Sequence, residues 1–107
     1  MLHGLYIITP SPFTPLTLAQ CEAALAAGIG VLQFRGKGLT SAQLLEYGQA
    51  LKSLCRRYHT PLIINDNIEL CQMLDADGVH LGQSDGSVSE ARRQLANKWI
   101  GVTCHNN

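Results

Sequence analysis

Charged and amide side chains occupy alternate positions in the segment 33–37, which reads Gln-Phe-Arg-Gly-Lys. Successive side chains of a strand point to opposite faces, so Gln33, Arg35 and Lys37 project to one side if the strand continues through them. An arginine in a parallel sheet needs a partner, because an unpaired buried charge is costly. Two partners remain open: a structural carboxylate near the strand end, or an anionic ligand at the carboxyl end of the sheet.

Two aspartates follow other apolar runs. Asp66 comes directly after 62–65, and Asp85 lies shortly after 78–81. Each has a purely structural interpretation, Asp66 at the start of a helix and Asp85 in a Ser-Asp-Gly turn. Parallel strands would nevertheless bring both carboxylates to the rim that carries the two cations. Such a set suits a magnesium-bound phosphate ester, because oxygen ligands hold the metal and the cations match the phosphates.

Histidines and cysteines give weaker signals. His80 and His105 are candidate general bases, although a lone histidine beside a strand is more often a hydrogen-bonded structural residue. The cysteines contain no Cys-x-x-Cys pair, which favours reduced, partly buried packing thiols over zinc ligands or disulfides. They are Cys21, Cys55, Cys71 and Cys104. We expect Trp99 to belong to the core.

The elements that must position these side chains alternate between short apolar runs and segments of helical period. The predicted strands are 5–9, 31–35, 62–65, 78–81 and 99–103. The predicted helices are 16–27, 40–58, 68–74 and 87–95. This alternation predicts an α/β fold, a parallel sheet of about five strands covered by about four helices.

Helix boundaries carry their own signals. Thr40 with Gln43 and Ser87 with Glu90 are predicted capping boxes, and Gly28 suits the position after the first helix. No Gly-x-Gly-x-x-Gly motif is present, so a dinucleotide-binding domain is unsupported.

Composition narrows the function classes. The chain has 107 residues, eight basic and eight acidic side chains, zero formal net charge and 46% hydrophobic residues. This balance argues against nucleic-acid binding, which needs a basic surplus. No apolar run approaches a membrane span, and no signal peptide is apparent. We expect a soluble cytoplasmic protein of one small domain.

Five segments together resemble the thiamine-phosphate synthases, in the same order and over nearly the whole chain. They are 4–9 (Gly-Leu-Tyr-Ile-Ile-Thr), 33–37, 62–66 (Leu-Ile-Ile-Asn-Asp), 76–85 (Ala-Asp-Gly-Val-His-Leu-Gly-Gln-Ser-Asp) and 100–105 (Ile-Gly-Val-Thr-Cys-His). The resemblance implies a (β/α)8 barrel that joins a hydroxymethylpyrimidine diphosphate to a thiazole phosphate and releases pyrophosphate.

The resemblance also implies roles for individual side chains. Those in the pyrimidine-diphosphate site would be Gln33, Arg35, Lys37, Asn65 and Thr103, the last standing where the family usually has serine. Arg35 and Lys37 would stabilise the departing diphosphate, and Asp66 and Asp85 would bind Mg2+. Gly36 replaces a common glutamate, which could loosen the site, and Asn67 replaces a frequent arginine.

Length sets the chain apart from a complete barrel. About five strands cannot close a barrel of eight, so residues 1–107 are interpreted as one truncated barrel domain, the amino-terminal half of a synthase-like enzyme. Its first and last strands would be exposed apolar edges, and we expect homo-oligomers formed through them. The alternatives are a thiazole tautomerase-like isomerase and a non-catalytic, phosphate-binding half-barrel.

Overall fold

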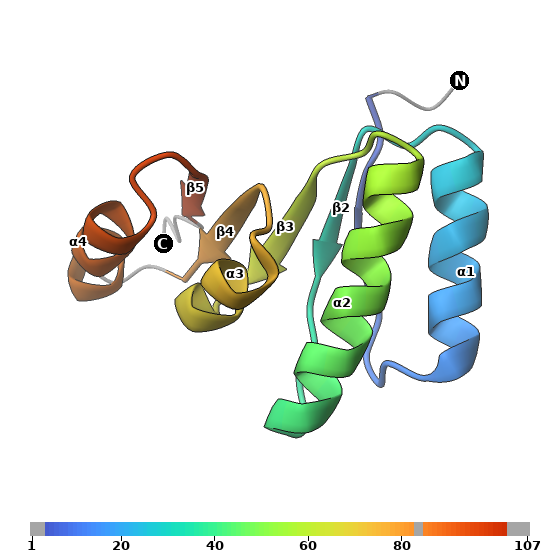
Figure 1. The fold of residues 1–107 in the computed structure, drawn as a ribbon, viewed down its shortest axis with the longest axis horizontal. Coiled ribbons are helices and arrows are strands. Elements are labelled where there is room, and N and C mark those ends of the chain that lie inside the picture. The colour runs from blue at the N-terminus through green and yellow to red at the C-terminus, as the bar shows by residue number, and fades with distance from the viewer. Residues whose placement is uncertain (1–3, 83–84, 103–107) are drawn as a thin grey trace, which may run out of the picture.

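Strands and helices alternate along the chain in a computed structural model, which describes residues 4–82 and 85–102 (Figure 1). The strands are β1 (Tyr6–Ile8), β2 (Val31–Phe34), β3 (Leu62–Asn65), β4 (Gly78–Leu81) and β5 (Trp99–Val102). The helices are α1 (Pro15–Ala26), α2 (Ser41–Arg57), α3 (Ile68–Leu74) and α4 (Asp85–Gln94). The expected α/β fold of five strands and four helices is confirmed.

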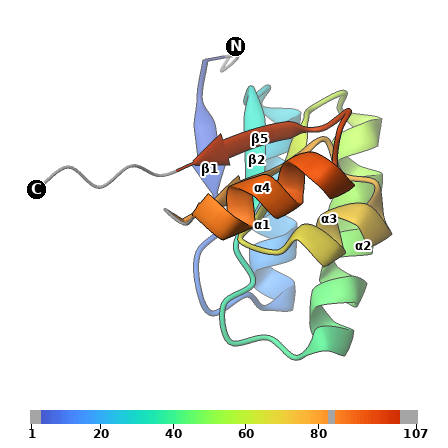
Figure 2. The same cartoon turned by 90° about the vertical axis from the view of Figure 1, so that its left-hand side faces the viewer.

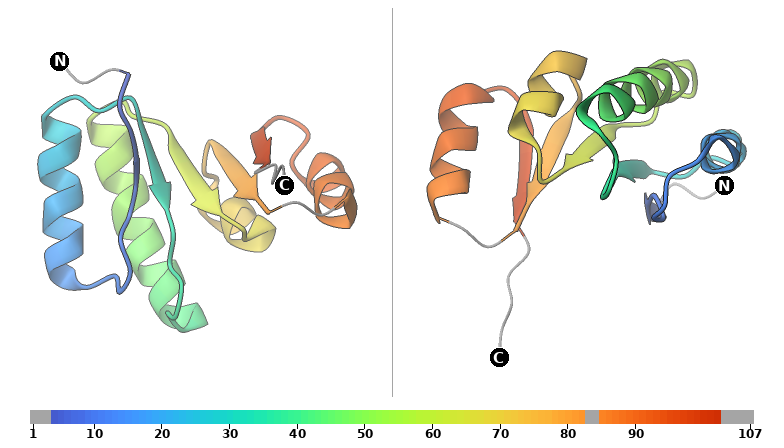
Figure 3. Two further views of the ribbon diagram at one scale, coloured as in Figure 1. Left: turned by 180° about the vertical axis from the view of Figure 1, so that it is seen from behind. Right: turned by 90° about the horizontal axis from the view of Figure 1, so that it is seen from below.

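All five strands are parallel and pair in sequence order, β1-β2-β3-β4-β5. Figure 3 shows the helices on one side of the curved sheet, and Figure 2 shows the same sheet and helices from the side. The other face of the sheet, called here the open face, carries no helix of the described chain. Both edges, β1 and β5, also lack a neighbouring strand within the described residues.

The core lies between the sheet and its helices. Leu32 and Phe34 of β2 are fully buried there, together with Ile64 of β3 and Val79 of β4. Burying a side chain of this size contributes about 1.5–3 kcal/mol, so these strand residues fix which face the helices cover. The residues between them in sequence, such as Gln33, therefore face the open side.

The helix boundaries confirm one predicted capping box and contradict the other. Thr40 accepts a hydrogen bond from the Gln43 backbone, and the Gln43 side chain accepts one from the Thr40 backbone. Helix α4 begins at Asp85, so Ser87 lies inside its first turn and the prediction that Ser87 caps this helix is wrong. The same boundary makes Asp85 the first helical residue rather than part of a turn.

Trp99 is not a core residue, contrary to our expectation. Its side chain is 50% exposed, because β5 is an edge strand and Trp99 stands on the open face. The indole ring lies over Gly101, where an added Cβ would meet it at 2.4 Å. Gly78 is equally confined, since a Cβ there would approach the Trp99 carbonyl oxygen to 2.4 Å. Glycine at both positions allows Trp99 and its strand to pack closely.

The prediction of reduced, packing thiols is confirmed for the three cysteines that the structure describes. Cys21, Cys55 and Cys71 are buried and free. Burial raises the pKa of all three thiols, that of Cys55 to about 12, because the thiolate loses its hydration. Cys104 lies outside the described residues. Within the described chain, no helix has the length and apolar character needed to cross a bilayer.

Candidate functional site

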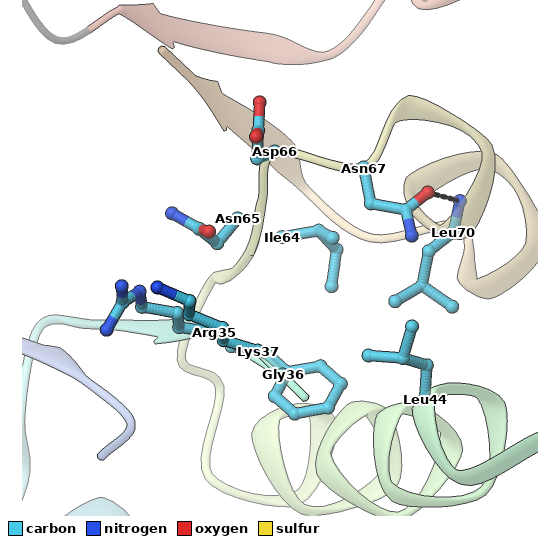
Figure 4. A pocket seen from close by; sticks show the side chains of 10 residues that line it. Arg35, Gly36, Lys37, Leu44, Ile64, Asn65, Asp66, Asn67 and Leu70 are labelled. Atoms are coloured by element: carbon cyan, nitrogen blue, oxygen red, sulfur yellow. Dashed lines mark hydrogen bonds between the residues drawn. The ribbon is translucent and has the colours of Figure 1, made fainter. Parts of the chain in front are cut away.

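A cavity of about 390 Å³ opens where β2 and β3 end (Figure 4). Parallel strands place their carboxyl ends on one rim, and the loops leaving that rim carry the polar lining. The polar residues predicted from the sequence that line it are Arg35, Lys37, Asn65 and Asp66. Two apolar walls come from the covering helices, with Leu44 of α2 and Leu70 of α3.

Arg35 comes directly after the last residue of β2, and its backbone is held by Thr9, the residue that follows β1. The Arg35 amide donates to Thr9 Oγ1 at 2.9 Å, and the Thr9 hydroxyl lies 3.4 Å from the Arg35 carbonyl oxygen. Thr9 is buried, so this contact fixes the end of the strand. The strand does not continue through Lys37, yet Figure 4 shows the nitrogen ends of Arg35 and Lys37 at one side of the same cavity.

Among the side chains that the structure describes, no carboxylate lies within ion-pair distance of Arg35 or Lys37. The proposed structural carboxylate for Arg35 is therefore not found in the part of the chain that the structure describes. Both cations line an open cavity instead, an arrangement that suits an anionic ligand.

Asp66 stands at a sharp turn after β3. Its amide donates to the His80 carbonyl oxygen at 2.7 Å, which extends the pairing of β3 with β4 by one residue. Its backbone then adopts a left-handed conformation, with φ of 54°, which aspartate tolerates better than most residues. The carboxylate is exposed and makes no hydrogen bond or ion pair with the residues that the structure describes.

Asn67, and not Asp66, caps the helix that follows. Asn67 Oδ1 accepts a hydrogen bond of 2.9 Å from the Leu70 amide, drawn as a dashed line in Figure 4. The interpretation of Asp66 as a helix cap is therefore wrong. Because Asn67 satisfies the helix start, the Asp66 carboxylate remains available to a ligand.

Gly36 does not leave a gap between the two cations. A Cβ at this position would lie 2.3 Å from Leu44 Cδ2 and 3.2 Å from Leu39 Cδ1. The space next to Gly36 is filled by these leucines, so the glycine is closely packed, and its effect on ligand binding stays a prediction.

Gln33 lies behind the cavity rather than in its lining, on the open face of β2. It is 2% exposed, and both ends of its amide are hydrogen-bonded. Gln33 Nε2 donates to Tyr6 Oη at 2.7 Å, and Gln33 Oε1 accepts from Asn65 Nδ2 at 2.8 Å. Tyr6 was not singled out as a site residue from the sequence. The sequence alone gives no signal for this contact, because it joins two residues that are 27 positions apart on different strands.

Three other candidates fall partly or wholly outside what the structure describes. Asp85 begins α4, but its side chain is not described, and Thr103 and His105 lie outside the described residues. His80, the register partner of Asn65, is half-buried on β4. Among the described side chains no group of three or more His, Cys, Asp or Glu residues could hold a metal ion.

Comparison with known proteins matches residues 5–107 to the sequence profile of thiamine monophosphate synthase. The chain belongs to this family. The resemblance seen in the five segments is thereby confirmed, and it assigns the chain to thiamine biosynthesis.

Individual relatives agree with the family profile. The thiamine-phosphate synthase of Methylobacillus flagellatus is 48% identical over 108 residues, covering 99% of this chain and 52% of the relative. That of Aromatoleum aromaticum is 46% identical over 107 residues, covering 98% of this chain and 51% of the relative. The chain thus spans about half the length of these relatives, which are transferases.

A solved structure shows the same fold. The thiamine phosphate pyrophosphorylase of Pyrococcus furiosus superposes with a TM-score of 0.87 at 29% sequence identity. The match covers 97% of this chain and 51% of that protein, so the five-stranded sheet corresponds to about half of a barrel-like enzyme.

Proposed function

We propose that residues 1–107 form the amino-terminal half of a thiamine-phosphate synthase barrel and carry its pyrimidine-diphosphate subsite. The observation that carries this proposal is the cavity at the ends of β2 and β3, in which Arg35, Lys37, Asn65 and Asp66 meet. Family membership supplies the reaction class, and the cavity supplies cations and a free carboxylate where a diphosphate and its metal would bind.

The proposed reaction needs charge stabilisation more than proton transfer. The bond between the pyrimidine methylene carbon and the diphosphate oxygen breaks, and the electron pair leaves with the diphosphate. The thiazole nitrogen then forms a carbon–nitrogen bond to the pyrimidine cation. Arg35 and Lys37 act on the departing diphosphate, because fixed cations aimed at developing negative charge lower the barrier. Arginine adds a planar fork that matches phosphate oxygens.

A magnesium ion fits the donor set at this rim. The Asp66 carboxylate is exposed, unpaired among the described side chains and adjacent to the cavity, and Mg2+ is typically held by one or two carboxylates together with substrate phosphates. Asp66 and Asp85 would hold the ion, which would supply further neutralisation of the leaving diphosphate. Asn65 and Thr103 complete the proposed pyrimidine side of the site, and Gln33 supports it from behind through its hydrogen bond with Asn65.

The proposal includes a cellular location and an oligomeric state. Three buried free thiols suit the reducing cytoplasm, where we place it. We also propose that the chain associates with itself through the uncovered β1 and β5 edges, because the described sheet ends on both sides in unpaired strands.

A non-catalytic, phosphate-binding half-barrel is the second candidate. The observation that favours it is the cavity itself, because Arg35 and Lys37 in its lining suit the binding of a phosphate ester without any reaction. Turnover measured with both substrates, the pyrimidine diphosphate and the thiazole phosphate, separates the two candidates. We expect diphosphate binding under either candidate, and a small but measurable turnover that requires Mg2+ and Arg35 only if the chain is part of a synthase.

Calorimetric titration tests the diphosphate subsite. We expect the chain to bind inorganic pyrophosphate only when Mg2+ is present, and Arg35→Ala to weaken this binding by about 10- to 100-fold, the range for a charged hydrogen bond. Arg93→Ala is the matched control, because Arg93 lies in the last turn of α4, away from the cavity. Equal binding by the two variants would refute the placement of the site.

A further inference from the structure

A row of hydrogen-bonded side chains crosses three strands diagonally on the open face. Tyr6 of β1 pairs in register with Val31, two residues before Gln33 on β2. Gln33 pairs in register with Ile63, two residues before Asn65 on β3. The row Tyr6–Gln33–Asn65 therefore starts at the first residue of β1, behind the cavity, and ends at the rim, where Asn65 lines the cavity.

The hydrogen-bonding capacity of this row decides what Asn65 presents to a ligand. Asn65 Nδ2 is used by Gln33 Oε1 at 2.8 Å, and the other end of the Gln33 amide is used by Tyr6 Oη at 2.7 Å. Asn65 Oδ1 has no partner among the described residues and is thus an acceptor available to the cavity. The neighbouring cations favour this arrangement, because an amide oxygen is stabilised beside Arg35 and Lys37 and an amide N–H is not.

Tyr6 is the outer anchor of the row. Gln33 is almost completely buried, so without the phenol oxygen its Nε2 would lose its partner inside the protein. The Gln33 amide could then flip, so that Gln33 Nε2 donates to Asn65 Oδ1. Asn65 Nδ2 would then be left to face the cavity. The cavity would in that case face an N–H donor instead of an acceptor.

We infer that Tyr6 is a positioning residue, which holds Gln33 and through it Asn65 so that the cavity offers an acceptor to an amino group attached to the pyrimidine ring. This inference rests on the proposed function, because it assigns the pyrimidine end of the diphosphate ligand to Asn65. Tyr6 itself touches neither the cavity nor the diphosphate end, which the cations bind. Removing the Tyr6 hydroxyl should therefore weaken recognition of the pyrimidine ring and leave recognition of the diphosphate unchanged.

The test uses Tyr6→Phe, with Tyr47→Phe as the matched control. Phenylalanine keeps the ring and removes only the hydroxyl, and Tyr6 is 41% exposed on an edge strand, where the change is sterically mild. Tyr47 packs against Phe13 at 4.6 Å between ring centroids, and its hydroxyl makes no hydrogen bond with the described residues. Tyr6→Ile serves as a second hydroxyl-free variant if the phenylalanine variant melts below the working temperature.

Three probes are titrated in the presence of Mg2+: inorganic pyrophosphate, an aminopyrimidine methyl diphosphate, and the same diphosphate without the ring amino group. We expect the unmodified chain to prefer the amino-bearing probe by about 5- to 10-fold, the value of one hydrogen bond. Tyr6→Phe should reduce this preference to less than about 2-fold and leave pyrophosphate affinity unchanged, whereas Tyr47→Phe should change neither.

A ligand-free measurement makes the positioning role independently testable. We expect the side-chain amide signals of Gln33 and Asn65 in nitrogen-15 NMR spectra to shift in Tyr6→Phe and to stay in place in Tyr47→Phe. Unchanged amide signals, or an unchanged preference for the amino group, would overturn the inference. An equal loss of affinity for all three probes in Tyr6→Phe would also overturn the inference. If no probe binds either protein, the proposed function fails, and the amide signals alone decide the role of Tyr6.

Discussion

Asp66 and Asn67 are adjacent, but they serve separate purposes in the structure. Asn67 caps α3 through its side-chain oxygen, and Asp66 turns the chain with a left-handed backbone and leaves its carboxylate exposed. A helix start needs only one such cap, so the second acidic or amide residue is available for chemistry. The sequence pattern does not reveal which of the two residues caps the helix, because this depends on where the chain turns.

Substitutions at the two positions should therefore have opposite effects. Asn67→Ala should lower the free energy of unfolding by about 1 kcal/mol, the usual value of a cap, and leave magnesium-dependent pyrophosphate binding intact. Asp66→Asn should abolish that binding and change stability little. Urea denaturation and calorimetry on both variants measure the two quantities. A cap-sized loss of stability in Asp66→Asn, with binding retained, would contradict the division.

For single residues, the sequence predicted which side chains belong to the site better than it predicted what those side chains contact. Alternation and position after apolar runs predicted all five polar site residues. The structure brings Arg35, Lys37, Asn65 and Asp66 to one cavity and places Gln33 behind it, hydrogen-bonded to Asn65. The prediction that Trp99 is a core residue was wrong because a large apolar side chain is buried only where a helix or strand covers it. Tyr6 was missed because its hydrogen bond joins residues on two strands that are 27 positions apart in the sequence.

The pairing of β4 with β5 depends on a close approach that only glycine permits. The Gly78 backbone faces Trp99 so closely that a Cβ would meet the Trp99 carbonyl oxygen at 2.4 Å. The obstacle is backbone, so it cannot move aside as a side-chain end would. The two strands would have to separate to admit any larger residue.

Gly78→Ala should consequently lower the free energy of unfolding by about 2–3 kcal/mol, in the upper part of the range for overpacking. Gly82→Ala is the control, because an added Cβ there meets nothing within 4 Å. Its effect should stay within about 0.5 kcal/mol. Thermal denaturation of both variants checks the prediction, and equal melting temperatures would show that β4 and β5 adjust without cost.

The elements themselves were largely predictable. Each apolar run became a strand and each helical period a helix, because a parallel sheet buries its strands and leaves helices half-exposed. The capping box of α2 was confirmed, and that of α4 failed because Ser and Glu three residues apart also occur inside a first turn. Strand ends were less predictable: the extended segment after Phe34 is held to Thr9 by a side chain and not by strand pairing.

The whole molecule exposes apolar surface at both ends of its sheet. Tyr6 and Ile8 are large and exposed on β1, and Trp99 and Val102 are exposed on β5. An apolar cavity of about 500 Å³ on the open face is lined by Tyr6 and Trp99 among others. An uncovered parallel edge can pair with another chain, so the described fold lacks the protection that edge strands normally have.

We therefore expect this chain to self-associate at micromolar concentration. Size exclusion with light scattering measures the molar mass, which should exceed 11.6 kDa and fall as the chain is diluted. Ile8→Lys places a charge on the exposed edge of β1 and should shift the equilibrium toward the monomer. Leu16→Lys is the control, because Leu16 is also exposed but lies on α1. A well-folded monomer at all concentrations would refute the prediction.

The sequential order of the strands has a consequence for how the protein is made. Because every strand pairs with the one that precedes it, each new strand finds its neighbour already present as synthesis proceeds. Each pairing then closes a loop no longer than one strand–helix–strand unit, which keeps the entropic cost of each step small. The sheet can thus grow one strand and one helix at a time while the ribosome is still translating the remainder.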